Sequence, residues 1–381
     1  MIKTLTILGS TGSIGVQALE VAELCGFEIV ALTANSRADI LENQIRKFSP
    51  KFAAVADETA AADLKIRVSD TSTKVLSGAK GVEECAAMQA DSVLNSIVGI
   101  AGLAPTVAAL EAGNALALAN KESLVTGGKL VMNLAAEKGL PILPVDSEHS
   151  AIFQSLQGCP DKKQIKRLIL TASGGPFFGR TKDELKNVTV EQALNHPNWS
   201  MGAKITIDSA TMMNKGLELI EAAWLFGVAA KNIDILVHRQ SIIHSLVEYA
   251  DNSVIAQLGV PDMRIPIQYA LTYPDRFVSP VKQLDLAQAA TLTFEKPDYE
   301  TFACINLCRS AFEKGGLYPA AVNAANEKAN ELFRQGKIGF LDIADAVQNA
   351  LETAENKDDY TLADVFETDK IIRSQTERLF L

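Results

Sequence analysis

Short apolar runs alternate with helix-like patterns over the first 145 residues of the chain. Strands that alternate with helices usually pair side by side in one direction, so this region predicts a parallel sheet flanked by helices. The predicted strands are Leu5–Leu8, Ile29–Leu32, Ala53–Ala56, Ser92–Val98, Ala115–Ala119 and Ile142–Val145.

The regular alternation of predicted strands and helices ends after residue 145. Residues 146–272 contain further apolar runs separated by polar, glycine-rich segments, where we expect the chemistry to lie because loops carry most functional residues. Residues 273–297 show little periodicity and are predicted to form a linker. Residues 298–381 are strongly helical in pattern, which predicts a small helical bundle. The predicted strands of the second region are Arg167–Leu170, Ile205–Ile207, Ile233–Val237 and Ser253–Gln257.

Length and composition narrow the class of protein. The 381 residues are 48% hydrophobic and 22% charged, as expected for a globular chain of two or three domains. A net charge of -10 argues against general nucleic-acid binding, which needs a basic face. The uncharged run Ser92–Leu110 contains glycines and a proline, so it predicts a strand, a loop and a helix rather than a membrane span. We therefore expect no membrane and no nucleic-acid partner.

The start of the chain and its cysteines favour a cytoplasmic location. The first strand begins almost at once, so no signal peptide is predicted. Five scattered cysteines indicate reduced thiols. Cys304 and Cys308 have helical spacing without a second ligand pair, which favours packing in a core over zinc binding.

A glycine-rich turn follows the first predicted strand and opens a helix. Gly9-Ser-Thr-Gly12-Ser-Ile-Gly15 has the spacing G-x-x-G-x-x-G, close to the usual dinucleotide fingerprint. Such glycines permit a tight turn and a close approach of the main chain to a pyrophosphate. We interpret the segment as a nucleotide-binding turn, with a purely structural turn as the alternative.

The end of the next strand indicates which dinucleotide is used. An NAD site usually has a carboxylate there to bind the ribose hydroxyls, whereas this chain has Asn35, Ser36 and Arg37. These side chains could hold a 2′-phosphate, which favours NADP. The alternative is that Arg37 is only a solvated residue at the start of a helix.

The run Asp208–Glu218 combines hydroxyls, an amide, an ammonium and carboxylates. Interpreted as a helix start, it has Asp208 or Ser209 as the cap, and the free N–H groups of the first turn favour an anion. Lys215 adds a positive charge, while Asn214 and Glu218 fall on one helix face. The run could therefore hold a phosphate and contribute a metal ligand; an ordinary capped surface helix is the alternative.

A pair of carboxylates stands where the last strand of the first region ends. In extended geometry Asp146 and Glu148 would point the same way and repel unless a cation lay between them. Oxygen ligands without a thiolate suit Mg²⁺ or Mn²⁺, and Glu218 could be the third ligand. The alternative is a helix cap at Asp146 or Ser147 with Glu148 in the first turn.

Three other segments offer polar side chains. Lys121 follows a buried strand, at the edge of the sheet where ligands usually bind, and could polarise a substrate oxygen. Ser173 precedes two glycines whose N–H groups could face an anion. His196 and Trp199 lie in a predicted loop that could contact the phosphate and cover the ligand. A surface lysine is the alternative for Lys121, and structural or packing roles are the alternatives for His196 and Trp199.

The order and spacing of these motifs resemble the 1-deoxy-D-xylulose 5-phosphate reductoisomerase family along the whole chain. The resemblance is carried by Gly9–Gly15, Ala119–Leu124, Pro144–His149, Leu170–Pro176 and His196–Glu218. It implies an α/β fold with an N-terminal Rossmann-like parallel sheet, a central α/β catalytic domain and a C-terminal helical bundle. It also implies NADPH, a divalent metal such as Mg²⁺ or Mn²⁺, and a homodimer.

The reaction implied by the resemblance rearranges and reduces 1-deoxy-D-xylulose 5-phosphate to 2-C-methyl-D-erythritol 4-phosphate, through retro-aldol cleavage and re-addition, in the non-mevalonate isoprenoid pathway. By matching position, the metal ligands are Asp146, Glu148 and Glu218, and with Lys121 they form the catalytic set. The substrate contacts are Lys121, Ser147, Glu148, Ser173, His196, Trp199, Ser209, Asn214, Lys215 and Glu218. The cofactor contacts are Thr11, Gly12, Ser13, Ile14, Asn35, Ser36, Arg37, Asn120, Glu122 and Gly202.

Two positions depart from the common family pattern: the turn Asn35–Arg37, and Ala203, where a basic residue is frequent. Two rival functions also stand beside the resemblance. A simple NADP-dependent dehydrogenase would need no set of carboxylates, and a nucleotide-sensing module would show no turnover. Loss of activity on adding a chelator separates the first rival from a metal-dependent reductoisomerase.

Overall fold

The computed structural model describes residues 3–199 and 201–381. These residues form two compact units. The first comprises Met1–Ser123, Lys129–Ser150 and Asp262–Val281; the second comprises Leu124–Gly128, Ala151–Pro261 and Lys282–Leu381. The chain thus passes between the units several times, and Asp262–Val281 returns to the first unit after the second has begun.

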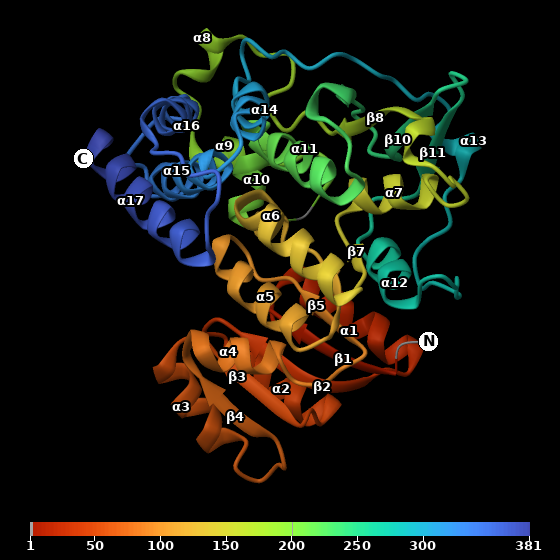
Figure 1. Cartoon of the computed structure of the whole chain (residues 1–381), viewed down its shortest axis with the longest axis vertical. Coiled ribbons are helices and arrows are strands. Elements are labelled where there is room, and N and C mark those ends of the chain that lie inside the picture. The colour runs from red at the N-terminus through yellow and green to blue at the C-terminus, as the bar shows by residue number, and fades with distance from the viewer. Residues whose placement is uncertain (1–2, 200) are drawn as a thin grey trace. The chain divides into compact units, whose positions relative to one another are not determined.

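The first unit contains a parallel sheet, confirming the α/β prediction. Among the described residues it has seven strands in the order β4-β3-β2-β1-β5-β6-β7 (Figure 1). The order reverses between β1 and β5, and ligands of such sheets usually bind at this switch point, beyond the carboxyl ends of the strands. The strands are β1 (Thr4–Leu8), β2 (Glu28–Ala34), β3 (Phe52–Val55), β4 (Lys74–Ser77), β5 (Ser92–Asn95), β6 (Ala115–Leu118) and β7 (Ile142–Pro144).

The helices that alternate with these strands follow local capping signals. Gly12 precedes α1 and Gly26 ends it in the left-handed conformation that glycine tolerates best. The Asn120 side chain caps α6 by accepting a hydrogen bond from the Ser123 N–H. The helices whose residues lie wholly or partly in this unit are α1 (Ser13–Cys25), α2 (Ala38–Phe48), α3 (Glu58–Arg67), α4 (Gly78–Ala86), α5 (Leu103–Glu111), α6 (Lys121–Lys138), α7 (Ser147–Ser155) and α12 (Arg264–Thr272).

The second unit contains a mixed sheet in the order β11-β10-β8-β9. The strands are β8 (Ile165–Ala172), β9 (Ile233–Val237), β10 (Ile243–Tyr249) and β11 (Val254–Leu258). β8 pairs in parallel with β9 and antiparallel with β10. β10 was absent from the sequence prediction because buried polar residues, His244 and Ser245 among them, interrupt its apolar pattern.

The predicted strand Ile205–Ile207 is wrong, because these residues lie within helix α10 (Ala203–Ala210). β-Branched residues favour strands only weakly, and tertiary packing overrides that preference. Here Ile207 is fully buried in the main hydrophobic core with Leu168 and Leu219. The Thr206 hydroxyl also donates to the Gly202 carbonyl one helical turn earlier, at 2.9 Å.

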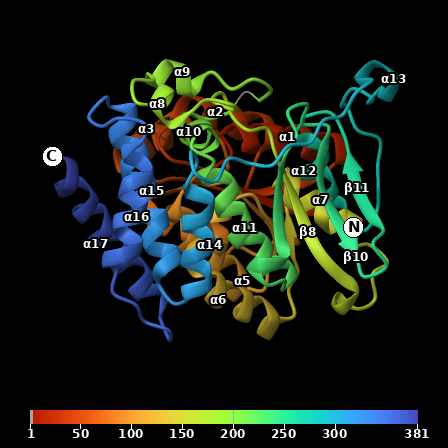
Figure 2. The ribbon, with the colours of Figure 1, turned by 90° about the horizontal axis from the view of Figure 1, so that it is seen from above.

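The C-terminal residues form a helical bundle, as predicted. α14 to α17 lie side by side and appear in blue in Figure 2, and α15 packs against α14, α16 and α17. Cys304 and Cys308 are buried on α14, where burial raises the pKa of Cys304 to about 12. The helices of the second unit are α8 (Lys182–Leu185), α9 (Val190–Leu194), α10, α11 (Met213–Phe226), α13 (Leu286–Ala289), α14 (Cys304–Lys314), α15 (Tyr318–Arg334), α16 (Asp342–Thr353) and α17 (Leu362–Phe380).

Among the described residues, no helix combines the length and apolar character needed to cross a bilayer.

Candidate functional site

The glycine-rich turn leaves β1 and opens α1, as predicted. Gly9 has a φ of 80°, and Gly12 precedes the first residue of α1. A Cβ atom on Gly15 would lie 2.3 Å from the Gly9 carbonyl oxygen, so a larger residue would push the helix away from the turn. The turn therefore has the close helix–strand packing that a dinucleotide-binding turn requires.

Buried polar side chains that sequence reasoning missed hold this turn in place. The Gln44 side chain on α2 donates to the Ser10 carbonyl at 2.9 Å and accepts from the Ser10 hydroxyl at 2.7 Å. The Thr33 hydroxyl on β2 accepts from the Gly9 N–H at 3.0 Å. A glutamine between Leu41 and Ile45 on the apolar face of a helix was the signal that could have revealed this support.

The end of β2 presents the three residues that were expected to bind a 2′-phosphate. Asn35, Ser36 and Arg37 are exposed, directly after the last strand residue, Ala34. The Arg37 guanidinium lies beside the glycine-rich turn, at 3.5 Å from the Thr11 carbonyl oxygen. The positive charge and the turn therefore lie at the same edge of the sheet.

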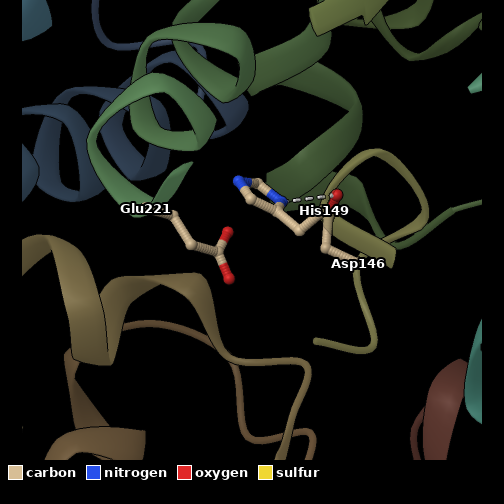
Figure 3. Close-up of side chains that lie close together, drawn as sticks. All are labelled: Asp146, His149 and Glu221. Carbon is tan, nitrogen blue, oxygen red and sulfur yellow. Dashed lines mark hydrogen bonds and ion pairs between the residues drawn. The ribbon is translucent and has the colours of Figure 1, made fainter. Parts of the chain in front are cut away.

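The buried Lys121 forms an ion pair with the partly buried Asp146 in the first unit, with Lys121 Nζ 2.8 Å from Asp146 Oδ2. The other Asp146 oxygen accepts from the Glu148 N–H at 3.1 Å and lies 3.0 Å from Nδ1 of the fully buried His149. Figure 3 shows the contact with His149 as a dashed line and also draws Glu221, which lies on α11. His149 is a residue of this cluster that sequence reasoning did not single out.

The expected extended geometry of Asp146 and Glu148 is wrong. α7 begins at Ser147, so Glu148 lies in its first turn, and Asp146 accepts main-chain and side-chain hydrogen bonds just before the helix. The capping alternative therefore describes the local structure. The Ser147 hydroxyl donates to the Glu148 carboxylate at 2.7 Å, which keeps these two side chains together. The Asn120 amide likewise donates to the Glu122 carboxylate at 3.1 Å.

The expected helix start at Asp208 or Ser209 is also wrong. Both residues lie in α10, and the chain turns through Met212, which has a φ of 59°, before α11 begins at Met213. Both helices are largely apolar in sequence, so no change of pattern marks the junction between α10 and α11. Asp208 does not cap a helix; its buried carboxylate instead accepts from Asn326 and Asn330 on α15.

α11 carries Asn214, Lys215 and Glu218, and the predicted common face of Asn214 and Glu218 is confirmed. The Asn214 amide and the Lys215 ammonium both donate to the Glu218 carboxylate, which is almost wholly buried. Burying a carboxylate is unfavourable unless a charge or hydrogen bonds compensate for it. One turn of α11 thus offers a compensated carboxylate together with an ammonium group and an amide.

Ser173 and His196 form a second polar cluster in the same unit. Ser173 follows β8, and the next two residues, Gly174 and Gly175, have φ values of 79° and 66°. The Ser173 hydroxyl lies 2.9 Å from His196 Nε2. Burial, and secondarily the charge of Arg239, lower the pKa of His196 to about 4, so its ring is neutral near pH 7.

The main chain selects the tautomer of His196. Its Nδ1 accepts hydrogen bonds from the N–H groups of Asn198 and Trp199, at 3.2 and 3.0 Å. In a neutral ring Nε2 then carries the proton and donates to the Ser173 hydroxyl. His196 is therefore set up as a neutral hydrogen-bond donor.

The segment around Trp199 is a loop, as predicted; Ser200 lies outside the described residues. The Trp199 ring contacts His244 edge-on, with 6.2 Å between ring centroids. Gly202 precedes α10, so the loop leads directly into that helix. Ser209 is half-buried on α10.

A parallel sheet with a glycine-rich turn, together with buried clusters of carboxylates and cations, defines an α/β enzyme of the dinucleotide-binding class. Models of the 1-deoxy-D-xylulose 5-phosphate reductoisomerase family match residues 5–128, and models of its C-terminal domains match residues 142–226 and 258–375. The chain belongs to this family, which confirms the resemblance and the prediction of an enzyme.

Similar proteins of the same family align over the full chain. The reductoisomerase of Acetivibrio thermocellus is 54% identical over 380 residues, covering 100% of both chains. That of Caldanaerobacter subterraneus is 53% identical over 382 residues, again covering 100% of both. A solved structure from Zymomonas mobilis in complex with NADPH has a TM-score of 0.93 and 44% identity, covering 100% of this chain and 99% of the other. A reductoisomerase in complex with NADPH, fosmidomycin and magnesium has a TM-score of 0.95 and 43% identity, covering 99% and 98%.

Proposed function

We propose that the chain converts 1-deoxy-D-xylulose 5-phosphate to 2-C-methyl-D-erythritol 4-phosphate, with NADPH and a divalent metal ion, as a step of the non-mevalonate isoprenoid pathway. The single observation that carries this proposal for the site is the Asn214–Lys215–Glu218 cluster on α11. In this proposal the Glu218 carboxylate is an oxygen ligand for the metal, and Asn214 and Lys215, which both contact it, are donors for the phosphate. A dehydrogenase that acts on a simple substrate needs neither.

The glycine-rich turn and the end of β2 fit NADPH. The absence of Cβ atoms at Gly9 and Gly15 lets Ser96 and the start of α1 pack closely against the turn, as in a dinucleotide-binding turn, and Arg37 supplies a positive charge beside it. The bound cofactor supplies the hydride. The proposed cofactor contacts are Thr11, Gly12, Ser13, Ile14, Asn35, Ser36, Arg37, Asn120, Glu122 and Gly202.

Asp146, Glu148 and Glu218 are proposed as the metal ligands. The three offer only carboxylate oxygens, which suits Mg²⁺ or Mn²⁺ better than zinc or copper. When bound, the ion polarises the substrate oxygens that it contacts. Lys121, paired with Asp146, supplies a further positive charge next to one of these ligands.

The phosphate is proposed to bind among hydroxyl, imidazole, amide and ammonium donors of the second unit. His196 would contribute as a neutral donor through Nε2, and Lys215, whose ammonium pairs with Glu218 in this structure, would contact the phosphate if a cation were bound at Glu218. Trp199, next to these donors in sequence, would cover the substrate and exclude water. The proposed substrate contacts are Lys121, Ser147, Glu148, Ser173, His196, Trp199, Ser209, Asn214, Lys215 and Glu218.

Binding energy from the phosphate end can stabilise an ordered loop and fix the orientation of the reacting end. Groups that hold a non-reacting part of a substrate raise the rate in this way without touching the bonds that change. The phosphate set, hereafter the phosphate cradle, consists of Ser173, His196, Ser209, Asn214 and Lys215.

Further proposals concern organisation and location. The functional divisions would be residues 1–145 for NADP binding, 146–272 for catalysis, 273–297 as a linker and 298–381 as the helical domain. The enzyme is proposed to be a homodimer, to bind no nucleic acid, and to work in the cytoplasm. The five cysteines form no disulfide bonds, which is consistent with the reducing environment of the cytoplasm.

Binding of Mn²⁺ tests the proposed ligands without relying on turnover. Free Mn²⁺ measured by electron paramagnetic resonance should fall as wild-type protein is added, and Glu218→Gln and Asp146→Asn should each weaken binding. Glu191→Gln, an exposed carboxylate on α9, serves as the matched control. Equal affinity in wild type and both site variants would refute the ligand assignment.

A further inference from the structure

The connection between β9 and β10 contacts both loops of the phosphate cradle, although none of its residues has been assigned a role so far. Arg239 lies in this connection and is half-buried. Its Nη1 donates to the Gly175 carbonyl at 3.0 Å and to the Ser173 carbonyl at 3.3 Å. One guanidinium nitrogen therefore holds the turn whose glycines have positive φ.

These contacts determine how the turn presents its N–H groups. The C=O and N–H of a trans peptide point in opposite directions. Because Arg239 draws the Ser173 carbonyl toward itself, the Gly174 N–H points away from the guanidinium. The Gly175 N–H meanwhile donates to the Ser173 hydroxyl at 3.2 Å, so the turn and that hydroxyl form one unit.

The main chain of Arg239 contacts the second loop. The Asn198 amide donates to the Arg239 carbonyl and, at 3.0 Å, to the Ser241 hydroxyl. The Asn198 N–H in turn donates to Nδ1 of His196. The side chain of Arg239 thus secures the Ser173 turn, while its carbonyl secures the loop that carries His196.

The charge of Arg239 is not neutralised by a carboxylate within the described part of the chain. Its guanidinium instead lies over the Phe178 ring, 5.0 Å from the centroid, and contacts the two carbonyls. Arg167, on β8 of the same unit, contrasts with this, because it pairs with Asp234 and Glu248. Arg239 therefore keeps a positive field beside Ser173 and His196.

We propose that Arg239 is a positioning residue for the phosphate cradle: it orients the Ser173 turn and the His196 loop together and favours a dianionic group between them. This inference rests on the proposed function, because it assumes that the cradle receives the substrate phosphate. Arg239 acts through Ser173, Gly174 and His196, so it adds to the binding of the phosphate end and leaves the chemistry at the carbon skeleton to other residues.

Steady-state kinetics of three variants test the role. Arg239→Met removes the charge and the two hydrogen bonds but keeps a stem that can pack on Phe178. Hydrogen bonds to charged groups contribute about 1.5–3 kcal/mol, so KM for the sugar phosphate should rise roughly 10- to 100-fold. The kcat should change less than KM, and KM for NADPH should stay as in wild type. Arg239→Lys should recover part of the loss, and Arg167→Met is the matched control.

A second readout is independent of turnover. The chain has two tryptophans, so Trp224→Phe leaves Trp199 as the single reporter in the cradle loop. Titration with inorganic phosphate should change Trp199 fluorescence, and Arg239→Met in this background should weaken phosphate binding while Arg167→Met does not. Far-ultraviolet circular dichroism checks that each variant folds; if Arg239→Met does not fold, Arg239→Lys provides the comparison.

The outcomes separate the inference from the proposed function. If wild type turns over the sugar phosphate and Arg239→Met has a KM within about twofold of it, the inference is overturned and the function stands. If wild type shows no turnover, the proposed function fails, and the phosphate titration alone decides: equal affinities in wild type and Arg239→Met overturn the inference, and weaker affinity in the variant supports it.

Discussion

The Asn330 amide donates a 2.9 Å hydrogen bond to the Asp208 carboxylate, which links α15 of the helical bundle to α10, the helix that carries Ser209. Both residues are buried, and Asn330 also donates to the Lys204 carbonyl at 2.9 Å. The ammonium of Lys204 lies 2.8 Å from the second Asp208 oxygen. The bundle thus holds the helix on which part of the proposed cradle lies.

Asn330→Ala should therefore lower the free energy of unfolding by about 2 kcal/mol, because it leaves a buried carboxylate and a carbonyl with fewer donors. Urea unfolding followed by circular dichroism measures the change. Gln335→Ala, at the exposed C-terminal end of α15, is the control and should leave the midpoint unchanged. Equal midpoints for Asn330→Ala and wild type would show that the contact contributes little.

Glu218→Gln should reduce kcat by about 100-fold or more with little loss of folded protein, because an amide would replace the charged carboxylate that we propose as a metal ligand, with a loss of several kcal/mol of charge stabilisation. The assay is turnover at saturating Mg²⁺ or Mn²⁺, with circular dichroism to monitor folding and Glu191→Gln as the control. Unchanged turnover at saturating metal would exclude Glu218 as a ligand.

His196 should act without changing its charge near neutral pH. Its pKa of about 4 lies below the ordinary value of 6.5, so the neutral form is favoured by folding. Between those two values the unfolded chain binds more protons, and the contribution of His196 to stability is lost as pH falls through this window. The folded enzyme should then show no acidic limb near pH 6.5 that belongs to His196.

His196→Gln retains an N–H donor at the distal end of the side chain, whereas His196→Phe removes it. We expect the glutamine variant to keep KM for the sugar phosphate within about tenfold of wild type. The phenylalanine variant should raise this KM by more than about tenfold, because it loses a hydrogen bond to a charged group. Full steady-state kinetics from pH 5 to 9 provide the test. Equal losses in both variants, or an acidic limb that disappears with His196, would contradict a neutral donor.

Arg37→Ala should raise KM for NADPH by about tenfold or more and leave KM for NADH nearly unchanged, because only the first cofactor carries the 2′-phosphate. Arg46→Ala is a suitable control, since Arg46 lies on α2, the helix that begins directly after Arg37, but pairs with Glu42 and Asp70. Kinetics with both cofactors measure the ratio of the two KM values. An equal rise in KM for NADPH and for NADH would mean that Arg37 does not bind the 2′-phosphate.

The sequence revealed those parts of the fold whose signals are local. β1 and β5 are almost wholly buried strands, and the glycine-rich turn marks the start of the helix that follows β1. β4 escaped prediction because it is a short edge strand with exposed ends, and its two central residues are only partly buried. The β-branched residues of Ile205–Ile207 predict a strand, whereas burial of Ile207 in the core, which the local sequence does not show, stabilises a helix there.

The site was predictable as a set of motifs but not as a set of contacts. The spacing of Asn214 and Glu218 on one helix face follows from helical geometry alone. Arg239 contacts Gly175, 64 residues away in sequence, and Asn330 contacts Asp208, 122 residues away. No periodic pattern in the sequence predicts contacts over such separations. Met212 in the left-handed conformation likewise separates two helices where the sequence suggests a single start.

The most direct test of the central claim is the absorbance of NADPH after addition of 1-deoxy-D-xylulose 5-phosphate to the purified chain with Mg²⁺ or Mn²⁺, repeated with a chelator. We predict loss of NADPH that requires both the sugar phosphate and the metal, stops with the chelator and returns when metal is restored. No loss of NADPH from folded protein with either metal, or a loss that the chelator leaves unchanged, would contradict a metal-dependent reductoisomerase.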